Sequence, residues 1–156
     1  MGEHYSQLLG LVDPWTIADV ALNTKACTLT ITLAERRDAQ LPCPECGTAV
    51  SRYDHGEMRT WRHLDTMQFT TTIKARLPRV SCETHGVKTV AIPWADAHAR
   101  WTLLFERFAI DVIEGTANIT RAMALLKINW EQVQAIQARG VERGLARRAE
   151  EEIKHA

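Results

Sequence analysis

The stretch Cys43-Pro44-Glu45-Cys46-Gly47, with its counterpart Cys82-Glu83-Thr84-His85-Gly86, decides the fold of this chain. Each stretch offers two metal ligands separated by two residues, and each ends in glycine. This spacing lets one tight turn aim both side chains at a single tetrahedral ion. A CxxC redox pair would leave the second stretch unexplained. We therefore predict a closed, structural Zn²⁺ site with the ligands Cys43, Cys46, Cys82 and His85, which leaves no position for a substrate.

The composition bounds the class of protein. The chain has 156 residues, enough for one domain or two very small ones, and its 19 basic residues balance its 19 acidic ones. This balance argues against a strongly basic nucleic-acid binder, so any basic patch must be local. The fourth cysteine, Cys27, lies in an apolar alternation and is expected to be a buried thiol. The cysteine usage, the lack of a signal-peptide pattern and the lack of an apolar stretch of about 20 residues predict a soluble, cytoplasmic protein with no membrane partner.

The first half of the chain carries strand patterns. Cys27, Leu29, Ile31 and Leu33 alternate with threonines at 28, 30 and 32, which is typical of a half-exposed strand. The residues between the two metal-binding stretches have room for a hairpin, with strands at 59–64 and 69–77, and residues 87–92 form a further short strand. We predict a small β-domain, clamped by zinc, which buries little core and depends on the metal for stability.

The pattern changes to helical after Pro93-Trp94-Ala95-Asp96. Helices are predicted at 101–114, at 119–127 with Asn118 as its cap, and from 130, where Asn129 and Gln132 form a capping box. The expected fold class is α+β, a small zinc-clamped β-domain followed by a helix-turn-helix domain. The expected divisions are an N-terminal β segment at 1–40 packing on the zinc domain, the zinc-binding β-domain at 41–93, the helix-turn-helix domain at 94–148 and a tail at 149–156.

The third helix has two contrasting sides at about 100° per residue. The apolar side is expected to pack inward and comprises Trp130, Val133, Ile136, Gly140 and Val141. In the second helix the inward residues are expected to be Ala122, Leu125 and Leu126, and the helical pattern of the first is carried by Leu103, Leu104, Phe108, Val112 and Ile113. The opposite stripe carries Gln132, Ala135, Arg139 and Arg143, and Gln and Arg are the side chains that bond adenine and guanine edges. The Gln and Arg side chains favour a helix-turn-helix that reads DNA, whereas Glu131 and Glu142 repel phosphate and count against it. A DNA-reading helix-turn-helix and a plain helical bundle therefore explain these residues equally well.

Several other basic, histidine and tryptophan residues could have either a functional or a structural role. Arg62, Lys74 and Arg76 on the hairpin could grip DNA phosphates, although a solvated sheet face explains them equally well. His55 and His63 are expected to make structural hydrogen bonds, and Trp61, Trp94 and Trp101 to pack in the core. The chain has no Gly-rich phosphate loop, nucleophile elbow or HExxH helix, so neither catalysis nor a small-molecule substrate is expected.

A series of motifs resembles the N-terminal region of bacterial insertion-sequence transposases of the ISL-three type. The resemblance begins with the CPxCG stretch and covers roughly residues 40–148. Its other motifs are Tyr53-Asp54-His55, Arg59-Thr60-Trp61-Arg62-His63-Leu64-Asp65, Pro78-Arg79-Val80-Ser81 before Cys82, Ile92-Pro93-Trp94-Ala95, Leu104-Phe105-Glu106-Arg107, Trp130-Glu131-Gln132-Val133 and Arg143-Gly144-Leu145-Ala146-Arg147-Arg148.

The resemblance implies a zinc-binding domain followed by a helix-turn-helix, with double-stranded DNA at the transposon ends as the partner. The expected task is recognition of the terminal inverted repeats. In the family a long catalytic domain follows, and this chain stops at Ala156, so strand cleavage is not expected of it. Two alternatives stay open: a zinc-stabilised protein-interaction module that assembles with itself or with full-length transposase, and a truncated derivative that inhibits transposition.

Overall fold

A computed structural model describes residues 2–155, and the chain divides into two compact units on either side of the Leu103–Leu104 bond. The first unit is built on a sheet and the second on helices, as the predicted α+β class requires. No helix within 2–155 is long and apolar enough to span a membrane. The two units are described separately.

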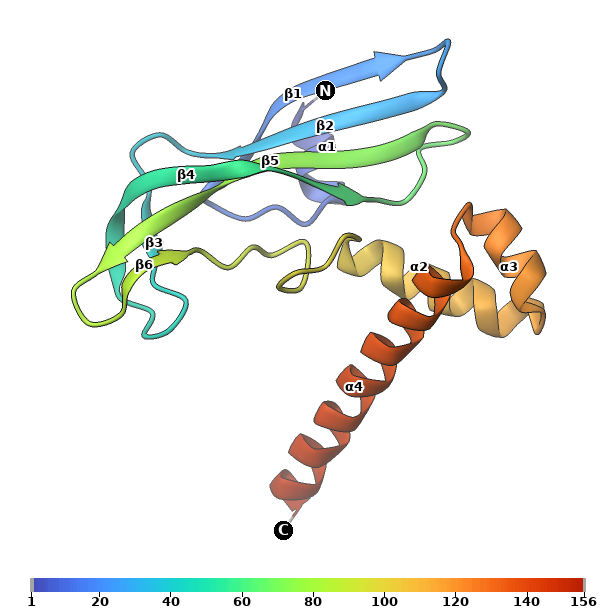
Figure 1. Ribbon diagram of the computed structural model, residues 1–156. Coiled ribbons are helices and arrows are strands. Elements are labelled where there is room, and N and C mark those ends of the chain that lie inside the picture. The colour runs from blue at the N-terminus through green and yellow to red at the C-terminus, as the bar shows by residue number, and fades with distance from the viewer. Residues whose placement is uncertain (1, 156) are drawn as a thin grey trace. The chain divides into compact units, whose positions relative to one another are not determined.

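The sheet unit begins with a short helix, α1 (Gly2–Leu8), and continues with six strands (Figure 1). The strands are β1 (Trp15–Asn23), β2 (Thr28–Glu35), β3 (Gln40–Pro42), β4 (Ala49–Arg62), β5 (Thr70–Cys82) and β6 (Gly86–Thr89). Their order in the sheet is β1-β2-β5-β4-β3, and β6 pairs with the zinc-ligand end of β5. All pairs are antiparallel except β2 and β5, which run parallel. The long β4–β5 hairpin is therefore the centre of the unit.

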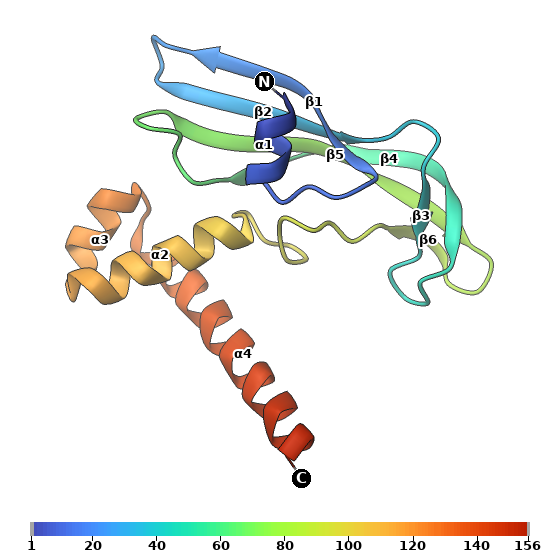
Figure 2. The same cartoon turned by 180° about the vertical axis from the view of Figure 1, so that it is seen from behind.

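One face of this sheet is the core face. Ile31 and Leu33 of β2 lie beside Ile73 and Ala75 of β5, and all four are buried. Trp61 of β4 pairs with Ile73 and is fully buried. Trp94 packs edge-on against both Trp61 and Trp15, with ring centroids 5.5 and 4.8 Å apart. Figure 2 shows α1 against the sheet, and Leu9 just after it joins the same core.

The sheet and its core correct three expectations. The sheet unit buries a cluster that runs from Leu9 to Ala99, so it is larger than the metal-dependent β-domain predicted from the sequence. The unit also continues past the expected boundary at Pro93, because Trp94, Ala95 and Ala99 belong to the core. Residues 1–40 are likewise part of the sheet, through β1 and β2, rather than a segment packed on it.

The turn between β1 and β2 overturns the interpretation of Cys27. The residues at 28–35 alternate as predicted, with half-exposed threonines opposite buried Leu29, Ile31 and Leu33. Cys27, however, is exposed and adopts a φ of 51°, in the turn that joins the two strands. The apolar alternation starts one residue after it, because the chain must reverse direction there and the turn residues leave the sheet.

The helical unit contains α2 (Leu103–Thr116), α3 (Ile119–Leu126) and α4 (Trp130–His155). Both predicted caps are confirmed. Asn118 Oδ1 accepts a hydrogen bond from the Arg121 N–H at 3.0 Å. Asn129 and Gln132 bond reciprocally, each backbone N–H to the other's side-chain oxygen at 2.9 Å. Because these bonds join residues three positions apart, the sequence fixes both helix starts without help from the rest of the fold.

The inward faces of the helices differ in part from the prediction. Ala122, Leu126, Val133 and Ile136 are buried as expected, and Ile113 is buried as well. Leu125, Trp130 and Val141 were expected to face inward and are instead exposed, and in α2 the apolar residues Leu104 and Phe108 are also exposed. Their places inside the unit are taken by Phe105, Ala109 and the carboxylate of Glu106. A charged residue at a buried position breaks the apolar period, so the pattern indicated a helix face that is rotated from the true one.

The buried Glu106 also changes the interpretation of α4. Its side chain is 0% exposed, and its Oε2 accepts a hydrogen bond from Arg143 Nη1 at 2.7 Å. Arg139 Nε lies 3.2 Å from Oε1 as a second ion pair. The expectation that Arg139 and Arg143 project outward with Ala135 is therefore wrong, because both guanidinium groups turn toward α2 to compensate a buried charge.

Candidate metal centre

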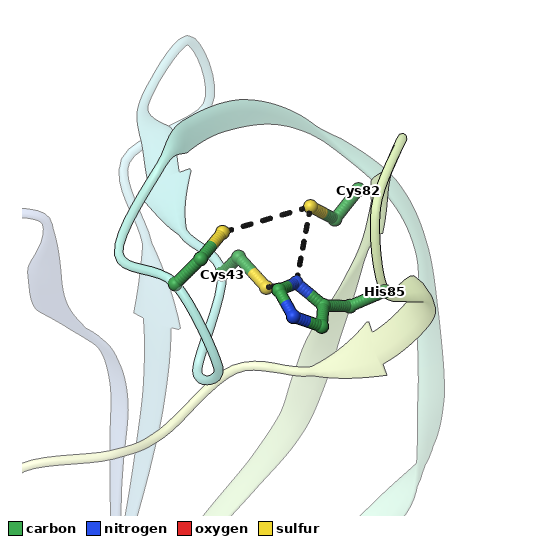
Figure 3. A group of neighbouring side chains, drawn as sticks. Cys43, Cys82 and His85 are labelled. Carbon is green, nitrogen blue, oxygen red and sulfur yellow. Dashed lines mark hydrogen bonds between the residues drawn. The ribbon is translucent and has the colours of Figure 1, made fainter.

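The four predicted zinc ligands come from three places in the sheet unit. Cys43 and Cys46 lie in the turn that follows β3, Cys82 is the last residue of β5, and His85 lies in the turn between β5 and β6. Figure 3 shows Cys43, Cys82 and His85 converging on one point. Antiparallel pairing of β4 with β5 places Arg52 opposite Val80, so the turn before β4 and the turn after β5 lie at the same end of the sheet.

Backbone bonds hold the first turn in the shape that a metal knuckle needs. The Gly47 N–H donates to Cys43 O at 2.8 Å, and the Cys43 N–H donates to Thr48 O at 2.9 Å. Gly47 adopts a φ of 75° and Gly86 a φ of 72°, conformations in which other residues are strained. The two glycines that end the motifs therefore let each turn close behind its pair of ligands.

The ligand atoms are spaced as a tetrahedral zinc site requires. Cys46 Sγ and Cys82 Sγ are 3.7 Å apart, and His85 Nδ1 lies 3.8 Å from Cys43 Sγ and 3.6 Å from Cys82 Sγ. With Zn–S about 2.3 Å and Zn–N about 2.0 Å, tetrahedral geometry separates two sulfurs by about 3.8 Å and a sulfur from a nitrogen by about 3.5 Å. The residues therefore fit Zn²⁺, and the Cys3His cluster is a structural zinc site.

The environment favours the thiolate form of two of the four ligands, Cys46 and Cys82, whereas the pKa of Cys43 is raised and the hydrogen bond with Cys82 raises the pKa of His85. Hydrogen bonds with the side chain and the backbone of Thr48 lower the pKa of the Cys46 thiol to about 6. The hydrogen bond with His85, together with the His85 and Thr84 backbone, lowers the pKa of Cys82. Thiolates are the form that binds zinc, so the turn prepares the site for the metal. With four protein ligands the shell is closed, and its chemical role is to tie β3 and β4 to β5 and β6.

Other titratable residues of the sheet unit are structural rather than ligands. Glu35 is buried, and its Oε1 lies 2.7 Å from both Arg52 Nη1 and His55 Nε2. His63 is buried as well, with its Nδ1 2.8 Å from Thr102 Oγ1, and burial lowers its pKa to about 4. The expectation of structural hydrogen bonds for His55 and His63 is confirmed. The buried role of Glu35 was missed, because the sequence places it in a run of charged residues that reads as a solvated turn.

The predicted DNA-contacting residues fall into two groups. Arg62, Lys74 and Arg76 share one face of the sheet, since Arg62 pairs with Thr72, and Lys74 and Arg76 are two residues apart on β5. Arg62 is tied to Asp65 Oδ1 at 2.5 Å and to His63 O at 2.7 Å. In the helical unit Ala135 is exposed, Gln132 is used in the capping box, and Arg139 and Arg143 pair with Glu106.

Known proteins resemble this chain over the same region. Residues 40–86, which contain all four ligands, match a family described as the zinc-finger of transposase IS204/IS1001/IS1096/IS1165. The transposase for insertion sequence element IS1557 from Mycobacterium tuberculosis, in strains CDC 1551 and H37Rv, is 39% identical over 98 residues. That match covers 62% of this chain and 22% of the relative, so the chain spans about a fifth of the length of the curated relatives it matches. No solved structure is significantly similar. The zinc centre of this chain thus lies in a segment that matches the zinc finger of insertion-sequence transposases.

Proposed function

We propose that this chain is the DNA-binding portion of an insertion-sequence transposase and that it recognises the terminal inverted repeats of the element. The support comes from the similarity to transposases and from the form of the helical unit. The helices α3 and α4 are joined by residues 127–129, the length of a helix-turn-helix connection. In that motif the second helix enters the major groove and its N-terminal residues touch base edges.

The exposed side of α4 carries this proposal. Around the helix, the direction opposite buried Val133 and Ile136 is occupied by Glu131 and Ala138, with Gln134 and Ala135 about 50° to either side, and all four are exposed. Gln134 can bond an adenine edge, and alanine permits close approach of the helix to the bases. Arg121, in the first turn of α3, is exposed and is placed to contact a phosphate. We therefore assign base reading to Gln134.

The residues predicted from the sequence receive adjusted roles in this proposal. Ala135 stays at the border of the reading surface. Gln132 supports the start of α4 through its capping bonds, and Arg139 and Arg143 hold α4 against α2 through Glu106. We propose that this chain binds DNA without cutting it, because the zinc shell is closed and leaves no position for an activated water.

The test compares binding to a duplex from the element's ends with binding to a scrambled duplex of equal composition. The wild-type chain is expected to prefer the end sequence, and Gln134→Ala is expected to lose about 1–3 kcal/mol of that preference. Gln137→Ala is the matched control, because Gln137 lies on the flank of α4 beside Ile110 and Ile113. Equal binding of wild type to both duplexes, in a salt series, would refute the proposal.

A protein-interaction module is the second candidate function, and one observation favours it. From Leu145 to Lys154 every residue of α4 is exposed, and Leu145 and Ile153 are among the exposed apolar side chains. Exposed apolar side chains that form a patch mark protein contact surfaces. Self-association in sedimentation experiments that is abolished by Leu145→Glu, together with equal binding to both duplexes, would make this the better function.

A further inference from the structure

The face of the sheet opposite the core is lined by threonines. Because side chains alternate along a strand, the residues between the buried positions of β2, β5 and β4 point to this side. They include Thr28, Thr30 and Thr32 of β2, Thr70 and Thr72 of β5, and Thr60 of β4. All six are half-exposed or exposed.

The strand register arranges these residues in rows across the sheet. One row runs Ala21, Thr30, Thr72 and Arg62, and the next runs Asp19, Thr32, Lys74 and Thr60. Arg76 follows opposite Met58. Among residues 2–155 the hydroxyls of these threonines have no hydrogen-bond partner, whereas Thr71 on the core face makes three such bonds. The rows therefore present free hydroxyl donors beside a group of cations.

The charges of this face favour an anionic partner. Lys74 and Arg76 have no ion-pair partner within the described part of the chain, while other cations of the same hairpin, Arg52 and Arg79, are paired with Glu35 and Asp54. Asp19 stands at the β1 end of its row, away from these two cations. On this face Arg62 is paired with Asp65, whereas Lys74 and Arg76 lie among the hydroxyls without an ion-pair partner within residues 2–155.

We propose that this threonine face, namely the six threonines with Lys74 and Arg76, binds the sugar-phosphate backbone of duplex DNA. The inference rests on the proposed function and adds to it a second, sequence-independent surface on the sheet unit. Threonine hydroxyls and Lys or Arg side chains are donors that proteins use for phosphate oxygens, and such contacts fix the orientation of a protein on the duplex. Two residues of one strand side by side, about 6.6 Å apart, can neutralise neighbouring phosphates.

The experiment measures duplex binding by the full chain over a salt series. Lys74→Gln/Arg76→Gln is expected to weaken binding to end and scrambled duplexes alike, on the order of tenfold, and to lower the slope of log K against log salt by about 2. The charge-matched control is Arg37→Gln/Arg100→Gln, since both residues are exposed and lie outside the threonine face. This control is expected to keep the wild-type slope. Thr32→Val/Thr72→Val keeps the side-chain shape and is expected to weaken both duplexes by a smaller factor.

Two results would overturn the inference. If the Lys74/Arg76 variant keeps the wild-type slope, or loses no more than the control, the face does not bind phosphates. A dimer in the absence of DNA that is disrupted by Thr32→Val/Thr72→Val would show that a second copy occupies the face instead. Failure of the proposed function is separate: a wild-type chain without preference for the end sequence refutes terminal-repeat recognition, while a reduced slope in the variant would still support the threonine face.

Discussion

His63 is the residue whose burial makes stability depend on pH. It lies in the core with Nδ1 2.8 Å from Thr102 Oγ1, and burial lowers its pKa from 6.5 to about 4. Between these two values the unfolded chain binds more protons than the folded chain, so the free energy of unfolding rises with pH. The contribution of neutral His63 to the free energy of unfolding is fully present above pH 6.5. Up to about 3 kcal/mol is lost as the pH falls toward 4.

The measurement is urea unfolding of the sheet unit across this pH range. We expect His63→Asn to remove the His63 part of the pH dependence, and His98→Asn to leave it, because His98 is exposed. Subtracting the variant from the wild type also removes the acid lability of the zinc site. If the free energies of unfolding of wild type and His63→Asn change in parallel with pH, His63 has the same pKa in the folded and the unfolded chain.

At the scale of elements, Glu106 sets how α4 packs on α2. Its buried carboxylate is compensated by Arg139 and Arg143, which are 24% and 38% exposed. Arg143→Ala removes a 2.7 Å charged hydrogen bond and leaves Arg139 alone beside the carboxylate. We therefore expect it to lower the free energy of unfolding of the helical unit by about 2–3 kcal/mol. Thermal unfolding followed by circular dichroism measures this loss.

Two variants sharpen that result. Arg147→Ala, on the exposed part of the same helix, is expected to change stability little. Adding Glu106→Leu to Arg143→Ala should recover part of the loss, because the buried charge is then gone. If Arg143→Ala instead changes DNA sequence preference at a temperature where the unit is folded, Arg143 reads a base after all and the sequence-based assignment of this residue was right.

For the whole molecule, the two units should respond differently to zinc removal. The metal ties the turn between β3 and β4 to the end of β5 and the turn before β6, whereas the core cluster from Leu9 to Ala99 does not include the ligands. We expect chelation, or Cys46→Ser, to expose the amides of residues 40–48 and 82–89 to hydrogen exchange. The centre of the β2–β5 pair and the helices should keep their protection, because their stability comes from apolar burial.

Hydrogen exchange followed by mass spectrometry, with and without chelator, gives the answer segment by segment. Loss of protection throughout β2 and β5 would mean that the metal carries the whole sheet. Loss of protection in α2 to α4 would mean that the two units fold as one. Zinc content measured before chelation should be one ion per chain.

Short-range patterns explain most of what the sequence predicted correctly. The ligand pairs at Cys43 and Cys82, the cap at Asn118 and the capping box at Asn129 each depend on residues within three positions of one another. The alternation from Leu29 to Leu33 likewise reports one strand with one buried face. Such features are set by local geometry, so they can be recognised before the fold is known.

The prediction of the buried side of α4 was wrong because a residue on the neighbouring helix decides which side of α4 is buried. The apolar pattern includes Trp130 and Val141, so the predicted inward direction of α4 is turned toward these two residues. Both are exposed, Trp130 by 49%. The stripe from Gln132 to Arg143 consequently lies on a flank of the helix rather than on its exposed side. The decisive residue was Glu106 on another helix, and no periodicity within α4 can show it.

The sequence by itself determined the zinc ligands, the helix starts and the two-residue rhythm of the strands. Only the tertiary structure decided that β2 pairs in parallel with β5, that Trp94 joins the sheet core, and that Glu106 receives two arginines. The physical reason is the separation along the chain of the residues that interact. Ligand spacing, caps and strand alternation depend on bonds within a few residues, whereas pairing partners and buried charges depend on which distant surfaces meet, and burial is favourable for any well-matched pair of surfaces.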